Sequence, residues 1–381
     1  MIDSTQIPLG RTGAGVYADY LIQQLGSLLQ PDDRLFVLVQ SDDIELGRRI
    51  DGHRNLSALA VRSSIFRNRL ALAFYEQCIL PWVLLFHRID VVHSLHYTFP
   101  LLCPVHRVVT LHDMTHTLYP EMHTRGRTIA MSTFAKLALR RAEGVLFVSD
   151  STRKDAERLF GPGRNLRAVT PLAVDHAVFD DIRPAAIDET LSRLGIDRPY
   201  ILFLGTLEPR KNVERLVHAF DSLGPEYSNF RLIVAGKPGW HYEAALEAIE
   251  NSPNKARIQR IGYVAPEDKA PLIAGCELLV YPSLYEGFGL PVLEGMAAGV
   301  PVITSNASSM PEIAGEAAVL IDPYSTEQIA AAIGSILSDE NLRQRLRRAG
   351  KAQAAKFSWE KTASLTCAAY RELARTAAAS E

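Results

Sequence analysis

The stretch Tyr281-Pro-Ser-Leu-Tyr-Glu286-Gly-Phe-Gly-Leu-Pro291-Val-Leu-Glu294 follows an apolar run at 278–281 that is typical of a buried strand. Pro291 suits the first turn of a helix, where its missing N–H is not needed. The stretch therefore predicts a strand, a loop and a helix, with Glu294 in the first helical turn. The two glycines let backbone approach a ligand, and a helix N-terminus offers N–H groups to an anion. Together with two carboxylates, these features suit a phosphorylated sugar, although an ordinary strand–loop–helix connection would share some of them.

Apolar runs alternate with helical patterns along the whole chain, which is typical of parallel sheets covered by helices on both faces. We expect strands at 35–39, 89–93, 107–111, 144–148, 200–204, 231–235, 257–261, 277–281, 300–304 and 318–321. Prolines and aspartates gather between residues 171 and 198, after which the alternation restarts. We therefore predict an α/β protein with two Rossmann-like domains, 1–175 and 176–357, that face each other across a cleft. A C-terminal helix, 358–381, is expected to return toward the first domain.

Composition and charge give no indication of a nucleic-acid-binding, zinc-binding, disulfide-rich or membrane-spanning protein. The 381 residues are 47% apolar and carry a net charge of −2, which gives no case for nucleic acid as a partner. Residues 1–175 hold 20 Lys and Arg against 17 Asp and Glu, whereas the remainder holds 21 against 26. Four scattered cysteines without a Cys-x-x-Cys pattern predict neither a zinc site nor a disulfide framework, and fit a cytoplasmic setting. We see no signal peptide pattern and no apolar run near the ~20 residues of a membrane span.

A second constellation lies at the start of the second half, in Tyr200-Ile-Leu-Phe-Leu-Gly205-Thr206-Leu-Glu-Pro-Arg210-Lys211-Asn212. A strand ends at the glycine, and two adjacent cations precede a helix that Asn212 is expected to cap. The arginine offers a fork of donors and the lysine a compact charge, so the pair suits a diphosphate. A solvated pair of surface charges is the alternative for Arg210 and Lys211.

Taken together, the two stretches closely resemble the retaining glycosyltransferases of family 4. The resemblance continues through Ala297-Ala-Gly299-Val-Pro301-Val-Ile-Thr304 and Pro311-Glu-Ile313, and covers essentially the whole second half. It implies the two-domain GT-B architecture, with the nucleotide-sugar donor bound to the second domain. It does not single out one sugar.

The resemblance also implies roles for individual residues. Arg210 and Lys211 would neutralise the donor diphosphate and, with Glu286 beside the donor sugar, count as catalytic. Glu294 would hold the ribose hydroxyls. The remaining donor contacts would come from Gly205, Thr206, Gly287, Phe288, Gly289 and Leu290. Gly236, Lys237, Tyr263 and Val264 are the candidates for contacts to the base, although Tyr263 suits core packing equally well.

The first half matches the family more loosely. Arg11-Thr12-Gly13-Ala14-Gly15 resembles the glycine loop that approaches the donor phosphates, so Gly13 and Gly15 are added to the donor site. The same residues imitate a dinucleotide fingerprint, but such a fingerprint should follow a full strand. Only Met1-Ile2-Asp3 precedes it as a possible strand. We interpret this as a truncated start or a short edge of the sheet.

Histidines end two of the expected strands in the first half. His112 follows the strand at 107–111, and the resemblance places a histidine here near the donor sugar and the acceptor. His93 ends the preceding strand, and Asp113 follows His112 directly. Because ligands bind beyond the carboxyl ends of such strands, His112 is a catalytic candidate, with His93 and Asp113 on the acceptor side. A hydrogen-bonded structural histidine is the alternative for each ring.

Arginines and aromatic residues mix between Arg62 and Arg88, including Arg67, Arg69, Phe74 and Trp82. Such a segment suits contact with anionic lipid headgroups, which would make the protein peripheral on the inner face of the membrane. A helix packed on the sheet with solvated arginines explains the pattern equally well.

By resemblance, the reaction moves a hexose with retention of anomeric configuration to a glycan or lipid-linked acceptor, in surface polysaccharide or glycolipid synthesis. Side-chain cations and helix amides stabilise the leaving diphosphate, so neither a metal nor another cofactor is expected. A carboxylate nucleophile at Glu286 is a variant. The loop Gly236-Lys-Pro-Gly239-Trp240 resembles mannosyl- and rhamnosyl-type transferases, which slightly favours a GDP-sugar donor.

Three alternatives stay open. A sugar-nucleotide epimerase or a phosphorylase has the same fold, although no lysine is recognisable as a pyridoxal site. A non-catalytic nucleotide-sugar binding protein would be expected to lose the paired acids and cations first. A nicotinamide enzyme is disfavoured by the short segment before Gly13.

Overall fold

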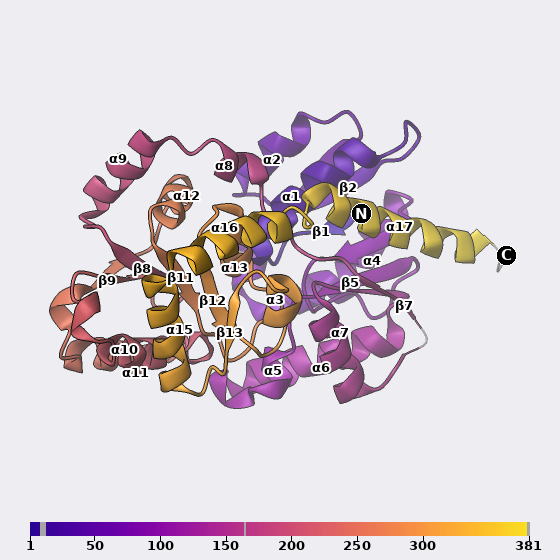
Figure 1. The fold of residues 1–381 in the computed structure, drawn as a ribbon. Coiled ribbons are helices and arrows are strands. Elements are labelled where there is room, and N and C mark those ends of the chain that lie inside the picture. The colour runs from indigo at the N-terminus through magenta and orange to yellow at the C-terminus, as the bar shows by residue number, and fades with distance from the viewer. Residues whose placement is uncertain (8–12, 164, 379–381) are drawn as a thin grey trace. The chain divides into compact units, whose positions relative to one another are not determined.

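The computed structural model describes residues 1–7, 13–163 and 165–378. The chain divides into two compact units. Unit 1 comprises 1–120, 124–172 and 359–381, and unit 2 comprises 121–123 and 173–358. The chain therefore leaves unit 1 near residue 172 and returns to it at the C-terminal helix. Each unit is built around one parallel sheet (Figure 1).

The sheet of unit 1 has seven parallel strands in the order β3-β2-β1-β4-β5-β6-β7. The order reverses between β1 and β4, so the crevice beyond the carboxyl ends of these two strands is the topological switch point. The strands are β1 (Ile2–Asp3), β2 (Leu35–Gln40), β3 (Leu56–Val61), β4 (Val91–Ser94), β5 (His106–Leu111), β6 (Gly144–Phe147) and β7 (Leu166–Val169).

The shortest strand of unit 1 lies inside the sheet and not at its edge. In β1, Ile2 pairs with Val37 on one side and with His93 on the other, and both residues of the strand are buried. The expectation of a short sheet edge at the N-terminus was therefore wrong. A two-residue strand carries almost no periodic signal, so its interior position follows only from the pairing.

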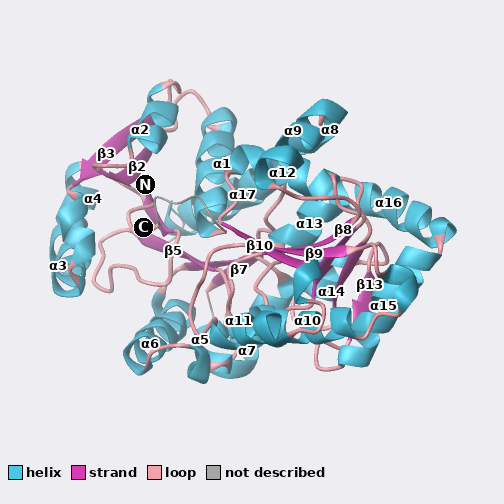
Figure 2. Ribbon diagram, turned by 90° about the vertical axis from the view of Figure 1, so that its left-hand side faces the viewer, coloured by secondary structure: helices cyan, strands magenta, loops and turns pink. Residues whose placement is uncertain are grey.

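Helices cover both faces of the unit 1 sheet (Figure 2). The C-terminal helix α17 completes the core of this unit: Ala369 and Leu373 are buried against Val108 and Leu146. The helices are α1 (Ala14–Leu28), α2 (Ile44–Asp51), α3 (Arg69–Phe74), α4 (Leu80–Phe86), α5 (Thr115–Leu118), α6 (Arg125–Arg141), α7 (Asp150–Phe160) and α17 (Trp359–Ala378). Shorter turns are the 3-10 helices η1 (Ser63–Arg67) and η3 (Pro120–Met122) and the π turn η2 (Tyr75–Ile79).

Unit 2 repeats the same plan with six parallel strands in the order β10-β9-β8-β11-β12-β13, so its switch point lies between β8 and β11. All six were expected from the sequence, and the bounds of β8 and β9 agree to the residue. The near-continuous burial of β8 and β11 is typical of parallel strands covered on both faces. The strands are β8 (Tyr200–Leu204), β9 (Arg231–Ala235), β10 (Ile258–Gly262), β11 (Leu278–Tyr281), β12 (Val302–Ser305) and β13 (Val319–Ile321).

Two groups of helices cover the faces of this second sheet, with α10, α11 and α15 on one face and α12, α13 and α16 on the other (Figures 1 and 2). The helices of unit 2 are α8 (His176–Asp180), α9 (Pro184–Leu194), α10 (Val213–Asp221), α11 (Glu243–Asn251), α12 (Pro266–Ala274), α13 (Leu290–Ala297), α14 (Met310–Ala314), α15 (Thr326–Ser338) and α16 (Glu340–Ala354). The short 3-10 helices are η4 (Pro209–Lys211), η5 (Pro225–Tyr227) and η6 (Lys255–Arg257). Among the described residues, no helix is both long enough and apolar enough to cross a membrane.

Candidate functional site

The stretches 205–212 and 281–294 meet at the switch point of unit 2, because they follow the neighbouring strands β8 and β11. The backbone N–H of Leu284 donates to the carbonyl oxygen of Arg210 at 2.7 Å, which ties the two loops directly. The side chains of Arg210, Lys211 and Glu286 gather at this junction. A crevice at the carboxyl ends of parallel strands is where ligands of such sheets bind.

Asn212 fixes the junction in a way that the sequence pattern did not predict. Its side-chain amide donates to the carbonyl oxygens of Pro282, at 3.0 Å, and Pro323, at 2.6 Å. The residue is in the left-handed conformation, with φ of 61°, and its side chain does not cap α10. Asn212 does lie at the N-cap position of α10, as expected, but its side chain makes no capping hydrogen bond. Buried carbonyl groups of two other loops accept from the side-chain amide instead, because they need a donor.

Glu286 is buried between both cations. Its Oε2 accepts from a guanidinium N–H of Arg210 at 2.7 Å, and its Oε1 accepts from Lys211 Nζ at 2.5 Å and from the Tyr281 hydroxyl at 3.0 Å. Arg210 also donates through Nε to Glu208 at 2.9 Å, and the Lys211 ammonium donates to the Tyr281 hydroxyl. Two cations and two carboxylates thus balance each other in one network.

The network sets the protonation state of Glu286. Burial alone raises the pKa of a carboxyl group, but the charges of Arg210 and Lys211 and their hydrogen bonds outweigh burial and lower the pKa of Glu286 to about 2. Burial, followed by the charge of Arg210, lowers the pKa of Lys211, and Glu286 opposes both effects. Glu286 is therefore a carboxylate at every physiological pH. In this state it accepts hydrogen bonds and cannot donate a proton.

Two serines that follow β12 hold the glycine-rich loop in place. The N–H of Glu286 donates to Ser308 Oγ at 3.0 Å, and Ser309 Oγ donates to the carbonyl oxygens of Glu286 and Phe288. Gly289 precedes α13 with φ of 116°, and a Cβ there would lie 2.3 Å from Met310 Cε. The ring of Phe288 is buried and packs edge-on against Phe357. From Gly287 to Leu290 the loop can therefore meet a ligand mainly through backbone.

Glu294 lies in the second turn of α13, one turn later than we predicted, because the helix begins at Leu290. The amides of Val292 and Leu293 donate to the Gly289 carbonyl oxygen, so only amides before them can serve an anion. Glu294 is buried, and its Oε1 accepts from Lys269 Nζ of α12 at 2.5 Å.

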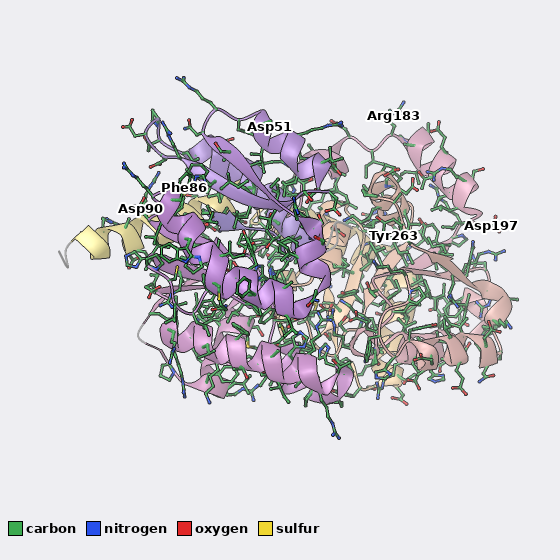
Figure 3. The ribbon with its side chains drawn as sticks, turned by 180° about the vertical axis from the view of Figure 1, so that it is seen from behind. Asp51, Phe86, Asp90, Arg183, Asp197 and Tyr263 are labelled. Atoms are coloured by element: carbon green, nitrogen blue, oxygen red, sulfur yellow. The ribbon has the colours of Figure 1, made fainter. Side chains whose placement is uncertain are left out.

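The loops after β8 and β9 run side by side. A Cβ on Gly236, whose φ is 146°, would lie 1.9 Å from the Gly205 carbonyl oxygen, so only glycine allows this approach. Thr206 lies against Gly239 in the same junction. Lys237 is exposed and Val264 is partly exposed. Tyr263 is 55% exposed (Figure 3), which excludes the core-packing alternative for this residue.

In unit 1, the structure gives His93 a structural position inside β4. The ring is fully buried, with Nδ1 2.5 Å from the Tyr370 hydroxyl and Nε2 2.7 Å from Thr110 Oγ1. Burial lowers the pKa of His93 to about 3, so the ring stays neutral. Both ring nitrogens are engaged in linking α17 to β5. The acceptor-side assignment of His93 was therefore wrong, and the structural alternative holds.

His112 lies just beyond β5 and is partly exposed. Its Nε2 donates to the Leu95 carbonyl oxygen at 2.9 Å, which leaves Nδ1 as the acceptor nitrogen of the neutral ring. Burial lowers the pKa of His112, which favours that neutral form. Asp113 accepts from the Tyr97 hydroxyl at 2.9 Å and from the Thr115 amide at 3.0 Å, so its carboxylate organises its own loop.

The glycine loop of unit 1 is described from Gly13 onward, and Arg11 and Thr12 lie outside the described residues. Gly13 is the N-cap of α1 with φ of 45°, and its carbonyl oxygen accepts from the Tyr17 amide at 3.1 Å. Gly15 is buried in the first turn of the helix. Both glycines therefore lie at a helix N-terminus, as a phosphate-facing loop requires.

Several residues of the unit 2 site were missed by sequence reasoning. Tyr281 and Glu208 were inside the quoted motifs, but neither a buried hydroxyl nor a second carboxylate beside Arg210 was recognised as a partner. The serines Ser308 and Ser309 follow β12, so their place beyond a strand end was a usable signal. Lys269 lies inside the helix α12 and not beyond a strand end, so its position in the sequence did not indicate a role in the site. Across the described ranges, no group of three or more His, Cys, Asp and Glu side chains is placed to hold a metal ion.

Comparison with known proteins identifies the family. Residues 188–353 match the model described as glycosyl transferases group 1, and residues 11–178 match glycosyltransferase family 4. The O-antigen chain mannosyltransferase B of Escherichia coli is 36% identical over 268 residues, which cover 70% of each chain. The serotype-specific mannosyltransferase WbdA of the same organism is 29% identical over 276 residues, which cover 71% of this chain and 34% of WbdA.

Solved structures show the same fold at low sequence identity. The sucrose-phosphate synthase of Thermosynechococcus elongatus has a TM-score of 0.78 at 18% identity and covers 98% of both chains. HepE of Anabaena, solved with UDP and glucose, has a TM-score of 0.75 at 18% identity, over 97% of this chain and 98% of HepE. The chain therefore belongs to glycosyltransferase family 4 and has the GT-B fold of two Rossmann-like units.

Proposed function

We propose that this glycosyltransferase moves a hexose, mannose-like or rhamnose-like, from a nucleoside-diphosphate sugar to a hydroxyl group of a glycan or lipid-linked acceptor. The anomeric configuration is retained, and the reaction belongs to surface polysaccharide or glycolipid synthesis on the cytoplasmic face of the membrane. Two of the E. coli relatives act, by their names, as mannosyltransferases of O-antigen chains or serotypes. Their sugar supports mannose as the first candidate and a GDP-sugar as the first donor to test.

The observation that carries this proposal is the burial of Glu286 between Arg210 and Lys211 at the switch point of unit 2. Sugar transfer breaks the bond between the anomeric carbon and the diphosphate oxygen, which leaves negative charge on the diphosphate. Preorganised cations in a water-poor site stabilise such charge most effectively. Of the three donors of the Lys211 ammonium, two go to Tyr281 and Glu286, and we assign the third to the diphosphate.

Glu286 serves as a hydrogen-bond acceptor for hydroxyl groups of the donor sugar. A carboxylate with a pKa of about 2 that already accepts from three side chains is a poor nucleophile. Attack therefore comes from the acceptor hydroxyl on the face that the diphosphate leaves. The new bond joins the acceptor oxygen to the anomeric carbon, and the departing phosphate oxygen takes the acceptor proton. This route retains configuration and needs neither a protein nucleophile nor a metal.

The other donor contacts follow the same plan. Glu294 takes the ribose hydroxyls in place of part of its pair with Lys269. Backbone from Gly287 to Leu290 lines the sugar and phosphates. Gly205 and Thr206 also contact the donor, and Gly236, Lys237, Tyr263 and Val264 take the base. In unit 1, Gly13 and Gly15 offer helix amides to phosphate, His112 offers Nδ1 to a sugar hydroxyl, and Asp113 lies on the acceptor side.

A donor screen followed by product analysis tests the proposal. A cognate donor raises the melting temperature, because it binds the native state alone, and we expect GDP-mannose to raise it more than the corresponding UDP-, dTDP- and ADP-sugars. With an oligomannoside acceptor and EDTA present, nuclear magnetic resonance should show an α-linked product from the α-linked donor. A β-linked product contradicts retention. Turnover that vanishes in EDTA and returns with a divalent cation contradicts metal independence.

A further inference from the structure

The helical segment from Arg69 to Phe86 exposes a row of large apolar side chains. Phe86 is 83% exposed, Leu70 82% and Trp82 72%. The row is completed by Phe74, Ile79 and Leu85. Exposed fractions this high mean that the side chains project from the surface and do not line a groove. Figure 3 shows Phe86 at the surface of unit 1.

The π turn at Tyr75–Ile79 brings this row onto one face. An α-helix advances about 100° per residue, so an unbroken helix would place Ile79, Trp82 and Phe86 well around the helix from Leu70 and Phe74. A π turn advances each residue by a smaller angle, because its hydrogen bonds reach one residue further. The five residues of η2 therefore rotate the second half of the segment back, so that both halves expose apolar groups on the same side.

The opposite face of the segment explains why this orientation is fixed. Tyr75, Leu80 and Leu84 are buried against Leu38 of β2 and Val92 of β4. These three residues anchor the segment to the core of unit 1. The exposed row therefore cannot turn inward without removing that core contact.

Arginines lie in the sequence on both sides of the exposed row. Between positions 62 and 88 the sequence holds four arginines and one acidic residue, Glu76, which is buried. Arg62 and Arg88 are exposed, whereas the side chains of Arg67 and Arg69 lie outside the described part of the structure. Asp90 lies beyond Phe86 at the end of the segment (Figure 3). Aromatic and aliphatic groups flanked by arginines complement a lipid surface with anionic headgroups.

We propose that the exposed face of α3, η2 and α4, with Trp82 and Phe86 as its main apolar anchors, docks on an anionic membrane surface. The apolar side chains enter the boundary between headgroups and acyl chains, and the arginines contact lipid phosphates. A second copy of the chain would instead need a matching surface that buries the whole row. The proposal concerns lipid binding without donor or acceptor, so it stands or fails separately from the proposed reaction.

Vesicle co-sedimentation tests the proposal. We expect the protein to bind vesicles that contain phosphatidylglycerol and to bind phosphatidylcholine vesicles much more weakly. The double variant Trp82→Glu/Phe86→Glu should lower the partition coefficient roughly ten-fold or more, because two apolar anchors are replaced by charges. Ile129→Glu, at a 67% exposed position of α6, is the matched control and should bind like the wild type. Equal melting temperatures would show that all variants fold.

Two further measurements identify the occupant. On vesicle binding, the tryptophan emission should shift to shorter wavelength, and Trp82→Phe should remove the shift. The variant Arg62→Glu/Arg88→Glu should bind several-fold more weakly, as should the wild type in high salt. Wild-type protein that ignores anionic vesicles, or a double variant that binds them fully, overturns the proposal. If the wild type forms a dimer that Phe86→Glu dissociates, and does not bind vesicles, the exposed face binds a second copy of the chain. If free glycerol phosphate displaces the protein from vesicles, the face contains a phosphate pocket.

Discussion

Both sheets bury a charged cluster at the switch point, and the two clusters differ in charge balance. In unit 2, Glu286 follows β11 and is paired with two cations that follow β8. In unit 1, Asp3 ends β1 and lies 3.4 Å from Nε2 of His96, which follows β4. Glu76 of the π turn lies beside this pair and is also buried. Within the described residues, Glu76 Oε1 has no hydrogen-bond partner.

The number of nearby positive charges sets the protonation state of each buried carboxyl group. Glu286 has two full positive charges within hydrogen-bond distance, and its pKa falls to about 2. Burial raises the pKa of Glu76 to about 7, because one shared histidine does not offset it and Asp3 adds a like charge. The cluster at the switch point of unit 2 therefore holds a carboxyl group with a lowered pKa, whereas the cluster in unit 1 holds one with a raised pKa.

The largest effect is expected at the cation pair. Lys211→Ala should lower kcat about 10²- to 10³-fold, because charge on the leaving diphosphate loses one preorganised partner. Arg210 still pairs with Glu286 in this variant, so the fold should persist, as circular dichroism would verify. Lys255→Ala, which removes an exposed lysine paired with Glu250, is the matched control. Near-normal turnover of Lys211→Ala would remove the charge-stabilising role from the unit 2 cluster.

The next effect concerns the stability of unit 1 as a function of pH. The pKa of Glu76 in the folded protein, about 7, lies above the ordinary value of 4.5 for a glutamate side chain. Its contribution to stability is therefore complete below pH ~4.5 and is lost as pH rises through ~7, by up to about 3 kcal/mol. Glu76→Gln should remove this loss and unfold at higher denaturant concentration than the wild type at pH 8.

The control for this prediction is Glu45→Gln at an exposed position of α2. It should keep the wild-type pH profile. The charged groups that face Glu76 are His96 and Asp3, and the polar side chains of Thr98 and Gln77 also lower its pKa. Burial lowers the pKa of His96, but the nearby carboxylate of Asp3 outweighs burial and raises it. A residual loss of stability with rising pH in Glu76→Gln therefore reports His96. Parallel profiles of the wild type and Glu76→Gln would show that Glu76 is ionised throughout.

The smallest effect is expected at Glu294. Glu294→Ala should raise the donor KM roughly ten-fold with little change in kcat, because ribose binding is the same in the ground and transition states. Lys269→Ala separates this role from the ion pair: it frees Glu294 for the ribose and should leave KM unchanged or lower. If both variants raise KM equally, the ion pair itself, and not ribose binding, carries the effect of Glu294.

The strands of unit 2 were predicted from the sequence more completely than those of unit 1. All six strands of unit 2 were expected, because each is an apolar run bounded by turn residues. In unit 1, β3 and β7 were missed because neither has a strong apolar run, and β1 was recognised only as a possible short strand within Met1–Asp3. The roles of His93 and Asn212 were misassigned because both are polar residues at strand or helix ends, where the local pattern is the same for ligand contact and for internal hydrogen bonding.

Local sequence patterns were enough to predict the fold class, the family and the loops that carry the candidate site, since periodicity, turn residues and short motifs are local properties of the chain. The tertiary structure decided which loops meet. Glu286 reaches Arg210 and Lys211 because the strand order of the sheet places β11 beside β8, and that order is set by packing between distant segments. It also decided which buried polar groups find partners, and therefore that Glu286 is an anion while Glu76 titrates near neutral pH.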